Sequence, residues 1–387
     1  MSHSLKNFDI YSVPSPCYII DEAQLEKNLQ ILADVQARSG AKVLLALKAF
    51  SMFDVAPLIM KYLSGTCASG PYEAQLGREE YGGEVHTYAA AYRPQDIEQV
   101  LALSNHVVFN TFNQWQQYKA QALAAQKARP ELSFGLRINP EHSEGATAIY
   151  DPCAPCSRMG IPLHQFENQD LSGIDGLHFH TLCEQDFAPL SRTLDAVESR
   201  FGHLLAQMKW INFGGGHHIT RDDYQVDALI ERVKTFSKAY SVQVYLEPGE
   251  AIALNAGIFV AEVLDTFTNN MELAILDASA TCHMPDVLEM PYRPQITGAG
   301  NPSEKPYTYR LGGPSCLSGD VIGDYSFDQP LKTGERLMFE DMAIYTMVKN
   351  TTFNGIPLPA IIKANSQTGR FETIKTFSYQ DFKMRLS

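Results

Sequence analysis

The chain has 387 residues, a formal net charge of −13 and a hydrophobic content of 45%. This length predicts two domains, since one domain takes about 100–200 residues, and the composition is typical of a folded protein with a large core. The acidic balance excludes a nucleic-acid-binding function, because binding phosphates requires a basic surface. It suits a cationic ligand, although acidity also serves solubility alone.

The N-terminal sequence MSHSLKNFDIYSVPSPCYII contains no basic stretch followed by an apolar run. No segment approaches about 18 uninterrupted apolar residues, the length that spans a membrane. We therefore expect a cytoplasmic protein with no membrane partner. Seven scattered cysteines are an odd number in a long chain, which favours reduced thiols. Cys153 and Cys156 form one close pair, but no second pair stands at ligand spacing, so no metal site is expected.

Between residues 43 and 247, short apolar runs alternate with amphipathic stretches, a pattern typical of parallel strands joined by helices. The expected strands are VLLAL (43–47), GTCAS (65–69), EVHTYA (84–89), HVVF (106–109), SFGLRI (133–138), IDGLHFH (174–180), KWINF (209–213) and VQVYL (242–246). The expected helices include PYEAQLGREEY, PQDIEQVLAL, TFNQWQQYKAQALAAQ, PLSRTLDAVESRFGHLL and DDYQVDALIERVKTFSKAY. Eight such units predict an α/β fold, a (β/α)8 TIM-like barrel.

After about residue 255 the sequence changes to β-type runs such as GIFVAEVLDTF, MELAILDAS and RLMFEDMAIYTMV, separated by segments rich in glycine, proline and asparagine. These runs predict a second, mostly β domain. An extended run near the N-terminus, CYII, precedes the first helix and could join it. We therefore predict a barrel over residues 22–255 and a β domain formed by residues 1–21 and 256–387.

The carboxyl ends of the expected strands carry an unusual set of residues. Barrel enzymes place their reactive groups at these ends. The residues found there are Lys48, Ser69, Asn110, Arg137, His180, Gly214–Gly216 and Glu247. Most are ionisable residues or glycines, whereas a strand end without a function usually passes into turn residues. The pattern indicates an active site.

Lys48 follows five apolar residues, where desolvation would lower the pKa of its amine and make it a usable nucleophile. A solvated strand end is the alternative for a single lysine. Gly214–Gly216 follow the seventh expected strand, where such barrels often bind phosphate. Glycines let backbone N–H groups approach an anion closely, although a tight turn also explains three glycines.

Glu247 ends the eighth expected strand, immediately before the Pro248–Gly249 turn. A carboxylate in this position could pair with the ring nitrogen of a cofactor. His178 and His180 alternate along one strand, so their side chains point the same way. We select His180, at the strand end, as the functional member, and leave a core role open for one of the two.

These residues belong to an ordered set of motifs: PSPCYIIDEAQLEKN, LALKA, SRMGI, GLHFH, NFGGG, EPGEA, GGPSCLSGD and AIYT, with FNG downstream. In this order the chain resembles the fold-type III pyridoxal-phosphate decarboxylases, the ornithine and diaminopimelate decarboxylase superfamily, over nearly its whole length. HTLCEQ, EPGEA, HMPDVLE and GPSCLSGD make it most similar, within that superfamily, to the carboxynorspermidine (carboxyspermidine) decarboxylases. The resemblance implies a carboxy-lyase of polyamine biosynthesis that acts on a small carboxylated polyamine.

The resemblance also implies the roles of individual residues. Lys48 would form the Schiff-base link to pyridoxal 5'-phosphate, His180 would stack on its ring, and Glu247 would pair with its pyridine nitrogen. Gly214–Gly216 and Tyr345 would hold the phosphate.

Cys316, in the expected β domain, would reach the active site of the partner subunit and act near Cα after carbon dioxide leaves. Arg158 would pair across the interface with Asp320 and tie down the Cys316 loop. These roles imply a homodimer with shared active sites.

The chain departs from the superfamily at two informative positions. Glu250 stands where ornithine and diaminopimelate decarboxylases carry an arginine, and Leu317 stands where they carry an acid. Glu250 supplies an anion for a substrate amine, and Asp286 is our second candidate for this role, with a surface carboxylate as the alternative for each. A diaminopimelate or ornithine decarboxylase remains an alternative. So does a non-catalytic regulatory homologue, which the retained Lys48 and Cys316 disfavour.

Overall fold

A computed structural model of the chain describes residues 4–145 and 148–387. The chain divides into two compact units. We call Asn28–Ile252 the barrel unit, and Met1–Lys27 together with Ala253–Ser387 the sheet unit.

Eight parallel strands form a closed ring in the barrel unit. In chain order they are β2 (Lys42–Ala46), β3 (Gly65–Ala68), β4 (Glu84–Tyr88), β5 (His106–Phe109), β6 (Ser133–Asn139), β8 (Gly176–His178), β9 (Trp210–Asn212) and β10 (Gln243–Leu246). Each strand pairs in parallel with its neighbour, and β10 pairs with β2, which closes the ring. A short ninth strand, β7 (Ile161–Pro162), pairs only with β6. The predicted (β/α)8 barrel is confirmed.

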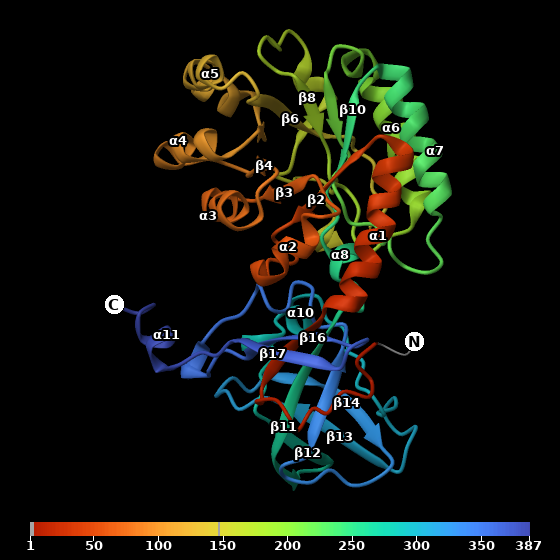
Figure 1. Ribbon diagram of the computed structural model, residues 1–387, viewed down its shortest axis with the longest axis vertical. Coiled ribbons are helices and arrows are strands. Elements are labelled where there is room, and N and C mark those ends of the chain that lie inside the picture. The colour runs from red at the N-terminus through yellow and green to blue at the C-terminus, as the bar shows by residue number, and fades with distance from the viewer. Residues whose placement is uncertain (1–3, 146–147) are drawn as a thin grey trace. The chain divides into compact units, whose positions relative to one another are not determined.

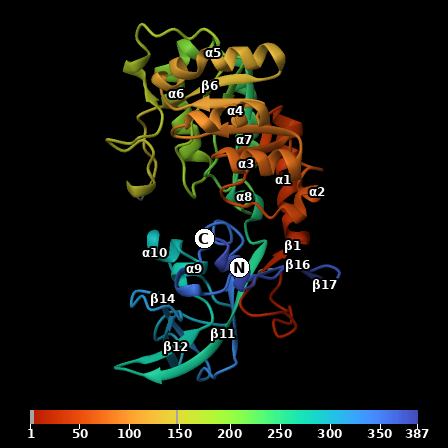
Figure 2. The same cartoon turned by 90° about the vertical axis from the view of Figure 1, so that its left-hand side faces the viewer.

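Helices surround these strands (Figures 1 and 2). They are α1 (Glu22–Ser39), α2 (Ala56–Ile59), α3 (Pro71–Leu76), α4 (Pro94–Leu103), α5 (Phe112–Ala128), α6 (Phe187–Leu205), α7 (Val226–Tyr240) and α8 (Glu250–Ala253). One connection departs from the repeating pattern. Between β6 and β8 the described residues form no α-helix, only the 3-10 turns η3 (Ala148–Tyr150) and η4 (Leu163–Phe166) with β7 between them.

Helix α6 shows why these segments fold as helices. Leu190, Leu194, Val197 and Phe201 recur every three or four residues and are all buried. Residues at this spacing share one face of an α-helix, so α6 buries a single apolar stripe. Each fully buried leucine or phenylalanine contributes roughly 1.5–3 kcal/mol of hydrophobic free energy, which stabilises the helix where intrinsic propensity alone would not.

The sheet unit contains strands from both ends of the chain. They are β1 (Cys17–Asp21), β11 (Gly257–Thr268), β12 (Glu272–Leu276), β13 (Tyr307–Gly312), β14 (Val321–Phe327), β15 (Arg336–Glu340), β16 (Ala360–Asn365) and β17 (Arg370–Lys375). The strand order is β14-β13-β12-β11-β1-β16-β17, with β15 paired to β11. Strand β1 is antiparallel to β11 and parallel to β16, so the N-terminal strand is central in this sheet. Three short helices complete the unit: α9 (Ala280–His283), α10 (Asp286–Glu289) and α11 (Tyr379–Lys383).

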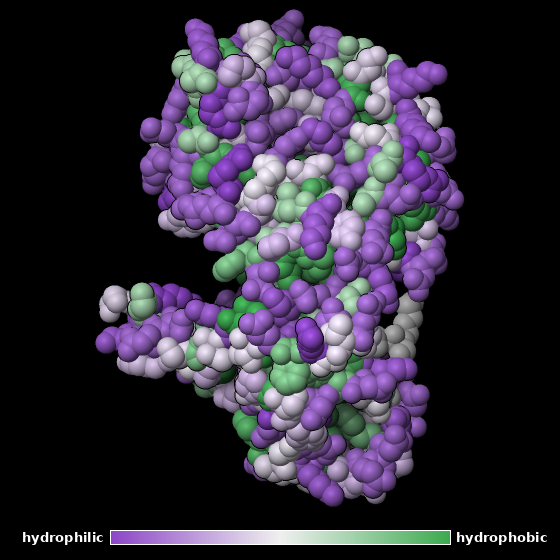
Figure 3. Space-filling model, viewed as in Figure 1, coloured by the Kyte–Doolittle hydropathy of each residue, from purple (hydrophilic) through white to green (hydrophobic). Residues whose placement is uncertain are grey.

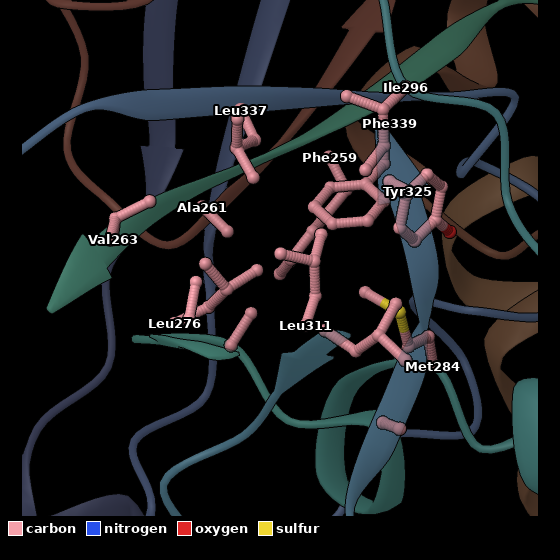
Figure 4. Close-up of a cluster of buried hydrophobic side chains, with 14 of the residues drawn as sticks. Phe259, Ala261, Val263, Leu276, Met284, Ile296, Leu311, Tyr325, Leu337 and Phe339 are labelled. Atoms are coloured by element: carbon pink, nitrogen blue, oxygen red, sulfur yellow. The ribbon is translucent and has the colours of Figure 1, made fainter. Parts of the chain in front are cut away.

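The first part of strand β11, Gly257–Ala261, is buried on both faces, whereas most of Leu264–Thr268 is exposed. Phe259, Ala261 and Val263 point to one side, where Figure 4 shows them packed with Leu276, Leu311, Tyr325 and Phe339. Ile258 and Val260 point to the other side, into a second cluster. This division follows from the alternation of side chains along a strand, and it explains why Gly257–Ala261 is a continuous apolar run in the sequence.

The helices, the surface and the cysteines have properties that bear on the expectations from the sequence. No helix within the described residues is both long and apolar enough to cross a membrane. Hydrophilic side chains predominate on the face of each unit that Figure 3 shows. All seven cysteines lie within the described residues and are free.

Candidate active site

Four of the predicted site features meet at the carboxyl end of the barrel. Lys48 follows β2, Glu247 follows β10, Gly214–Gly216 follow β9, and His180 follows β8. These four strands are consecutive neighbours in the ring. Because all are parallel, their carboxyl ends lie at the same edge, and the four features form one continuous surface.

Lys48 and His180 are in direct contact, with 3.3 Å between Lys48 Nζ and His180 Nε2. The Lys48 side chain is open to solvent, as an amine that must reach a ligand has to be. Even so, the surrounding protein removes part of its water, and this desolvation lowers the pKa of Lys48. Burial also lowers the pKa of His180, and the nearby Lys48 and Arg137 add to the effect. His180 is therefore neutral at pH 7.

Gly214–Gly216 form a loop in which no side chain fits. A Cβ on Gly215 would lie 2.2 Å from the Glu247 carbonyl oxygen, and a Cβ on Gly216 would lie 1.9 Å from the Leu182 carbonyl oxygen. Gly214 and Gly216 also have positive φ angles of 67° and 85°, which favour glycine. His180 Nδ1 lies 3.2 Å from both the N–H and the carbonyl oxygen of Gly215, so the loop also orients this ring.

The Glu247 carboxylate has a separate donor for each oxygen. Asn212 Nδ2 donates to Oε1 over 2.6 Å, and His178 Nε2 lies 3.3 Å from Oε2. Burial alone would raise the pKa of Glu247, but hydrogen bonds from His178 and Asn212 outweigh burial and lower it. The carboxylate is therefore ionised and held in one orientation.

Several residues of the site escaped selection from the sequence. His178 and Asn212 hold Glu247. Strand alternation places each of them on the same face as a selected residue two positions later, but the sequence does not show that either contacts Glu247. The buried Arg137 stacks 4.7 Å from the centre of the Tyr88 ring and donates to the His180 carbonyl oxygen over 2.8 Å. Arg137 is one of the strand-end residues of the sequence, but no role was predicted for it. Burial raises the pKa of Cys67 well above its usual value, so its thiol faces Glu247 in the neutral form.

Glu250, one of the two predicted amine-binding acids, already has a basic partner. Its Oε2 lies 3.2 Å from Nε2 of His218, which follows the glycine loop. Burial lowers the pKa of His218, but the hydrogen bond and charge of Glu250 outweigh burial and raise it. Glu250 is thus paired within the barrel unit.

The remaining predicted residues, Cys316, Tyr345 and Asp286, belong to the sheet unit. Cys316 is exposed, and its backbone N–H donates to Asn354 Oδ1 over 2.8 Å. Tyr345 has a φ of 57°, an uncommon conformation for a bulky residue and one that is often found at functional sites. Asp286 forms an ion pair of 2.5 Å with Lys349.

A polar cluster lies at the opposite, amino end of the barrel strands. Glu84, His86 and His106 have potential ligand atoms within 4.8 Å of one another. The two imidazole rings, however, are stacked 3.9 Å apart with an interplanar angle of 20°. Nearly parallel rings cannot both direct an in-plane lone pair at one ion, and the Lys42 ammonium already pairs with Glu84. The cluster is better described as an ion pair beside a histidine stack.

The residues at the carboxyl end of the barrel fit pyridoxal 5'-phosphate. An accessible lysine amine can form a Schiff base with the aldehyde, and an ionised carboxylate can pair with the ring nitrogen. A loop that only backbone can line suits a phosphate group. The barrel and this donor set together define a pyridoxal-phosphate enzyme.

Comparison with known proteins identifies the family. The family model described as "Pyridoxal-dependent decarboxylase, C-terminal sheet domain" matches residues 17–343. The chain belongs to the pyridoxal-dependent decarboxylases, and it is a carboxy-lyase that uses pyridoxal 5'-phosphate.

Relatives and a solved structure match nearly the whole chain. A carboxynorspermidine/carboxyspermidine decarboxylase of Campylobacter jejuni is 42% identical over 384 residues, 96% of this chain and 98% of the relative. A carboxyaminopropylagmatine decarboxylase of Synechocystis sp. is 44% identical over 384 residues, 99% of this chain and 98% of the relative. The crystal structure of a carboxynorspermidine decarboxylase from Campylobacter jejuni, complexed with norspermidine, superposes with a TM-score of 0.88 at 41% identity, covering 96% of this chain and 100% of that chain.

Proposed function

We propose that the enzyme decarboxylates carboxynorspermidine or carboxyspermidine, giving norspermidine or spermidine in polyamine biosynthesis. The observation that carries this proposal is the nearly full-length similarity to the Campylobacter jejuni relative named for these substrates. Glu250 is consistent with it, because an acid after Glu247-Pro248-Gly249 favours a cationic substrate over one with a distal carboxylate.

Carboxyaminopropylagmatine is a second candidate substrate, because the Synechocystis relative of comparable identity bears that name. The two kinds of substrate share a reacting carboxylate and differ at the far end, where agmatine carries a guanidinium group and spermidine an ammonium group. A planar guanidinium binds a carboxylate through two parallel hydrogen bonds, whereas an ammonium acts as a point charge. The acids that bind the far end of the substrate therefore determine which of the two substrates the enzyme prefers.

In the proposed mechanism Lys48 would hold the cofactor covalently, His180 would contact its ring, and Gly214–Gly216 with Tyr345 would hold its phosphate. Bound pyridoxal phosphate supplies a ring that accepts the electron pair left when the bond between Cα and the carboxylate breaks. Glu247 keeps the ring nitrogen protonated, which strengthens this capacity. Its own ionisation, supported by His178 and Asn212, makes it suited to the task.

We propose that Cys316 returns a proton to Cα after carbon dioxide departs, directly or through a water that it positions. The thiol belongs to the sheet unit and is exposed, so it is available to another subunit. We infer a homodimer in which each Cys316 serves the barrel of its partner.

Glu250 and Asp286 are the proposed partners of the substrate's distal amines. Each already pairs with a basic side chain of its own unit, His218 and Lys349 respectively. Substrate binding would therefore exchange one cation for another at each carboxylate. Such an exchange avoids leaving a partly buried charge unpaired, which would cost several kcal/mol.

The proposed setting is the cytoplasm. The free thiols support a reducing compartment, since an oxidising one favours disulfides.

One experiment tests the proposed substrate. Purified enzyme would be incubated with carboxynorspermidine, carboxyspermidine, carboxyaminopropylagmatine, diaminopimelate and ornithine, and the release of carbon dioxide would be measured. We expect the highest kcat/KM for one of the first two. A higher kcat/KM for carboxyaminopropylagmatine would establish the second candidate, and activity only on diaminopimelate or ornithine would contradict both.

A further inference from the structure

The orientation of Glu247 depends on the register of three neighbouring barrel strands. His178 on β8 stands opposite Asn212 on β9, and Asn212 stands opposite Tyr245 on β10. Glu247 lies two residues beyond Tyr245, so its side chain points to the same side of the strand. The register therefore brings one donor to each carboxylate oxygen, His178 to Oε2 and Asn212 to Oε1.

His178 is fully enclosed, with 2% of its surface exposed. Its ring lies 5.4 Å from the Tyr88 ring, which carries the Arg137 guanidinium 4.7 Å above its centre. No described residue offers a hydrogen-bond partner to Nδ1 of His178. The polar contact that remains for this ring is Nε2 with Glu247.

This environment fixes the protonation state of His178. Burial disfavours a second proton on the ring and, with the positive charges of Arg137 and Lys48, outweighs the attraction of Glu247 and lowers the pKa of His178, so one nitrogen carries a proton and the other does not. A carboxylate accepts but does not donate, so the proton stands on Nε2. His178 is thus a neutral donor aimed at Glu247.

We propose that His178 is a positioning residue for the cofactor. It keeps the Glu247 carboxylate ionised and fixes the orientation in which that carboxylate meets the pyridine nitrogen. The inference rests on the proposed role of Glu247 and extends it, because it assigns to a second buried histidine a task distinct from that of His180. A histidine that only fills the core would give the same burial but no energetic coupling to Glu247.

A double-mutant cycle on the full-length protein separates the two roles. The variants are His178→Leu, Glu247→Gln and their combination. The main readout is the dissociation constant of the apoenzyme for pyridoxal phosphate at pH 7.5, measured by absorbance titration, and kcat and KM are the second. We expect His178→Leu to weaken cofactor binding about tenfold, the loss expected for a hydrogen bond to a charged acceptor. It should lower kcat with little change in KM.

The double variant distinguishes a positioning role of His178 from a role in core packing alone. In the Glu247→Gln background, His178→Leu should change the dissociation constant less than about twofold, because the partner charge is already gone. If His178→Leu weakened cofactor binding by the same factor in the native and the Glu247→Gln backgrounds, His178 would only fill the core, and the inference would be overturned. If Glu247→Gln alone leaves cofactor binding and kcat unchanged, the proposed role of Glu247 fails instead.

Two further variants keep the test valid if His178→Leu does not fold. The amide nitrogen of His178→Gln stands at the position of Nε2 and reaches Glu247, whereas that of His178→Asn is too short to do so. The glutamine variant should bind the cofactor within about threefold of the native enzyme and the asparagine variant about tenfold more weakly. Equal binding by the two would contradict the inference. His106→Leu, the same change at a buried histidine of the opposite barrel end, is the matched control and should leave cofactor binding unchanged.

Discussion

The Ser315 hydroxyl donates a 2.6 Å hydrogen bond to a carboxylate oxygen of Asp320. The same oxygen accepts from the Ser279 hydroxyl over 2.8 Å, and the Asp320 side chain is almost fully buried. Asp320, at one end of the short loop that carries Cys316, thus holds the other end through Ser315 and fixes the loop to Ser279, which precedes α9. The inferred pairing of Asp320 with Arg158 across an interface stays a prediction, and Asp320 has hydrogen-bond partners within its own unit.

The Ser315 contact leads to a prediction about Cys316. Ser315→Ala removes a hydrogen bond to a charged acceptor, a loss of about 1.5–3 kcal/mol, and should loosen the position of the thiol. We expect kcat to fall about tenfold or more while the affinity of the apoenzyme for pyridoxal phosphate is unchanged. Steady-state kinetics and a cofactor titration measure the two quantities. Ser318→Ala, an exposed serine of the same loop, is the control, and an equal loss of kcat in it would contradict the prediction.

Lys48 should carry the cofactor. The purified protein should be yellow, and borohydride should attach the cofactor to Lys48, because the accessible amine with a lowered pKa forms a Schiff base readily. Peptide mapping by mass spectrometry locates the label. Lys48→Ala should lose both the label and the activity. A label on another lysine would refute the proposed site.

A shared active site should permit complementation between subunits. Lys48→Ala and Cys316→Ala are each expected to be nearly inactive, and mixing them should restore one intact site in each heterodimer. At equal concentrations with random exchange about half of the dimers are mixed, so about a quarter of native activity should return. Native mass spectrometry would verify that subunits exchange. Exchange without recovered activity would show that the two residues act within one subunit.

The two acids proposed to bind the substrate's amines should control specificity. Glu250→Gln and Asp286→Asn each remove an anion from a proposed amine site, and loss of one partner of a partly buried ion pair costs about 2–5 kcal/mol. We expect kcat/KM for carboxynorspermidine to fall at least about tenfold in each variant, with the cofactor spectrum unchanged. Glu304→Gln, an exposed acid, serves as control. Native kcat/KM in both variants would leave pocket length as the source of specificity.

The histidine stack at the amino end of the barrel should make stability depend on pH. Burial lowers the pKa of His106 well below 6.5, and the neighbouring His86 and Lys42 add to the effect. Above about pH 6.5 His106 is neutral in both the folded and the unfolded chain and has no effect. Below that value only the unfolded chain takes up the proton. The free energy of unfolding therefore decreases as the pH is lowered, by up to about 1.4 kcal/mol per pH unit.

His106→Phe keeps a ring of similar shape and removes the titrating group. Its thermal midpoint should therefore fall less than that of the native protein between pH 7.5 and pH 5.0, as measured by scanning calorimetry on the apoenzyme. His203→Phe, a change at an exposed histidine, should behave like the native protein. An equal drop in the His106→Phe and native proteins would contradict the prediction.

Much of the barrel could be predicted because each strand is a short apolar run and most of the runs are followed by an ionisable residue or a glycine. The connection between β6 and β8 could not, since it contains short 3-10 turns whose stability comes from tertiary contacts. The selection of Lys48, His180, Glu247 and the glycines followed from their place at strand ends. His178 and Asn212 lie within strands, where burial hides whether a polar side chain has a partner. That information exists only once the register of β8, β9 and β10 is known.

The central position of β1 in the sheet has a consequence for biosynthesis. This strand precedes the barrel in the chain and leaves the ribosome before it, yet its hydrogen-bonding partners, β11 and β16, begin only at Gly257 and Ala360. Since domains tend to fold as they emerge, the barrel can close while β1 still has two unpaired edges. An apolar strand left in this state is prone to pair with other chains. The nascent enzyme is therefore expected to need protection by a chaperone until β16 has been synthesised.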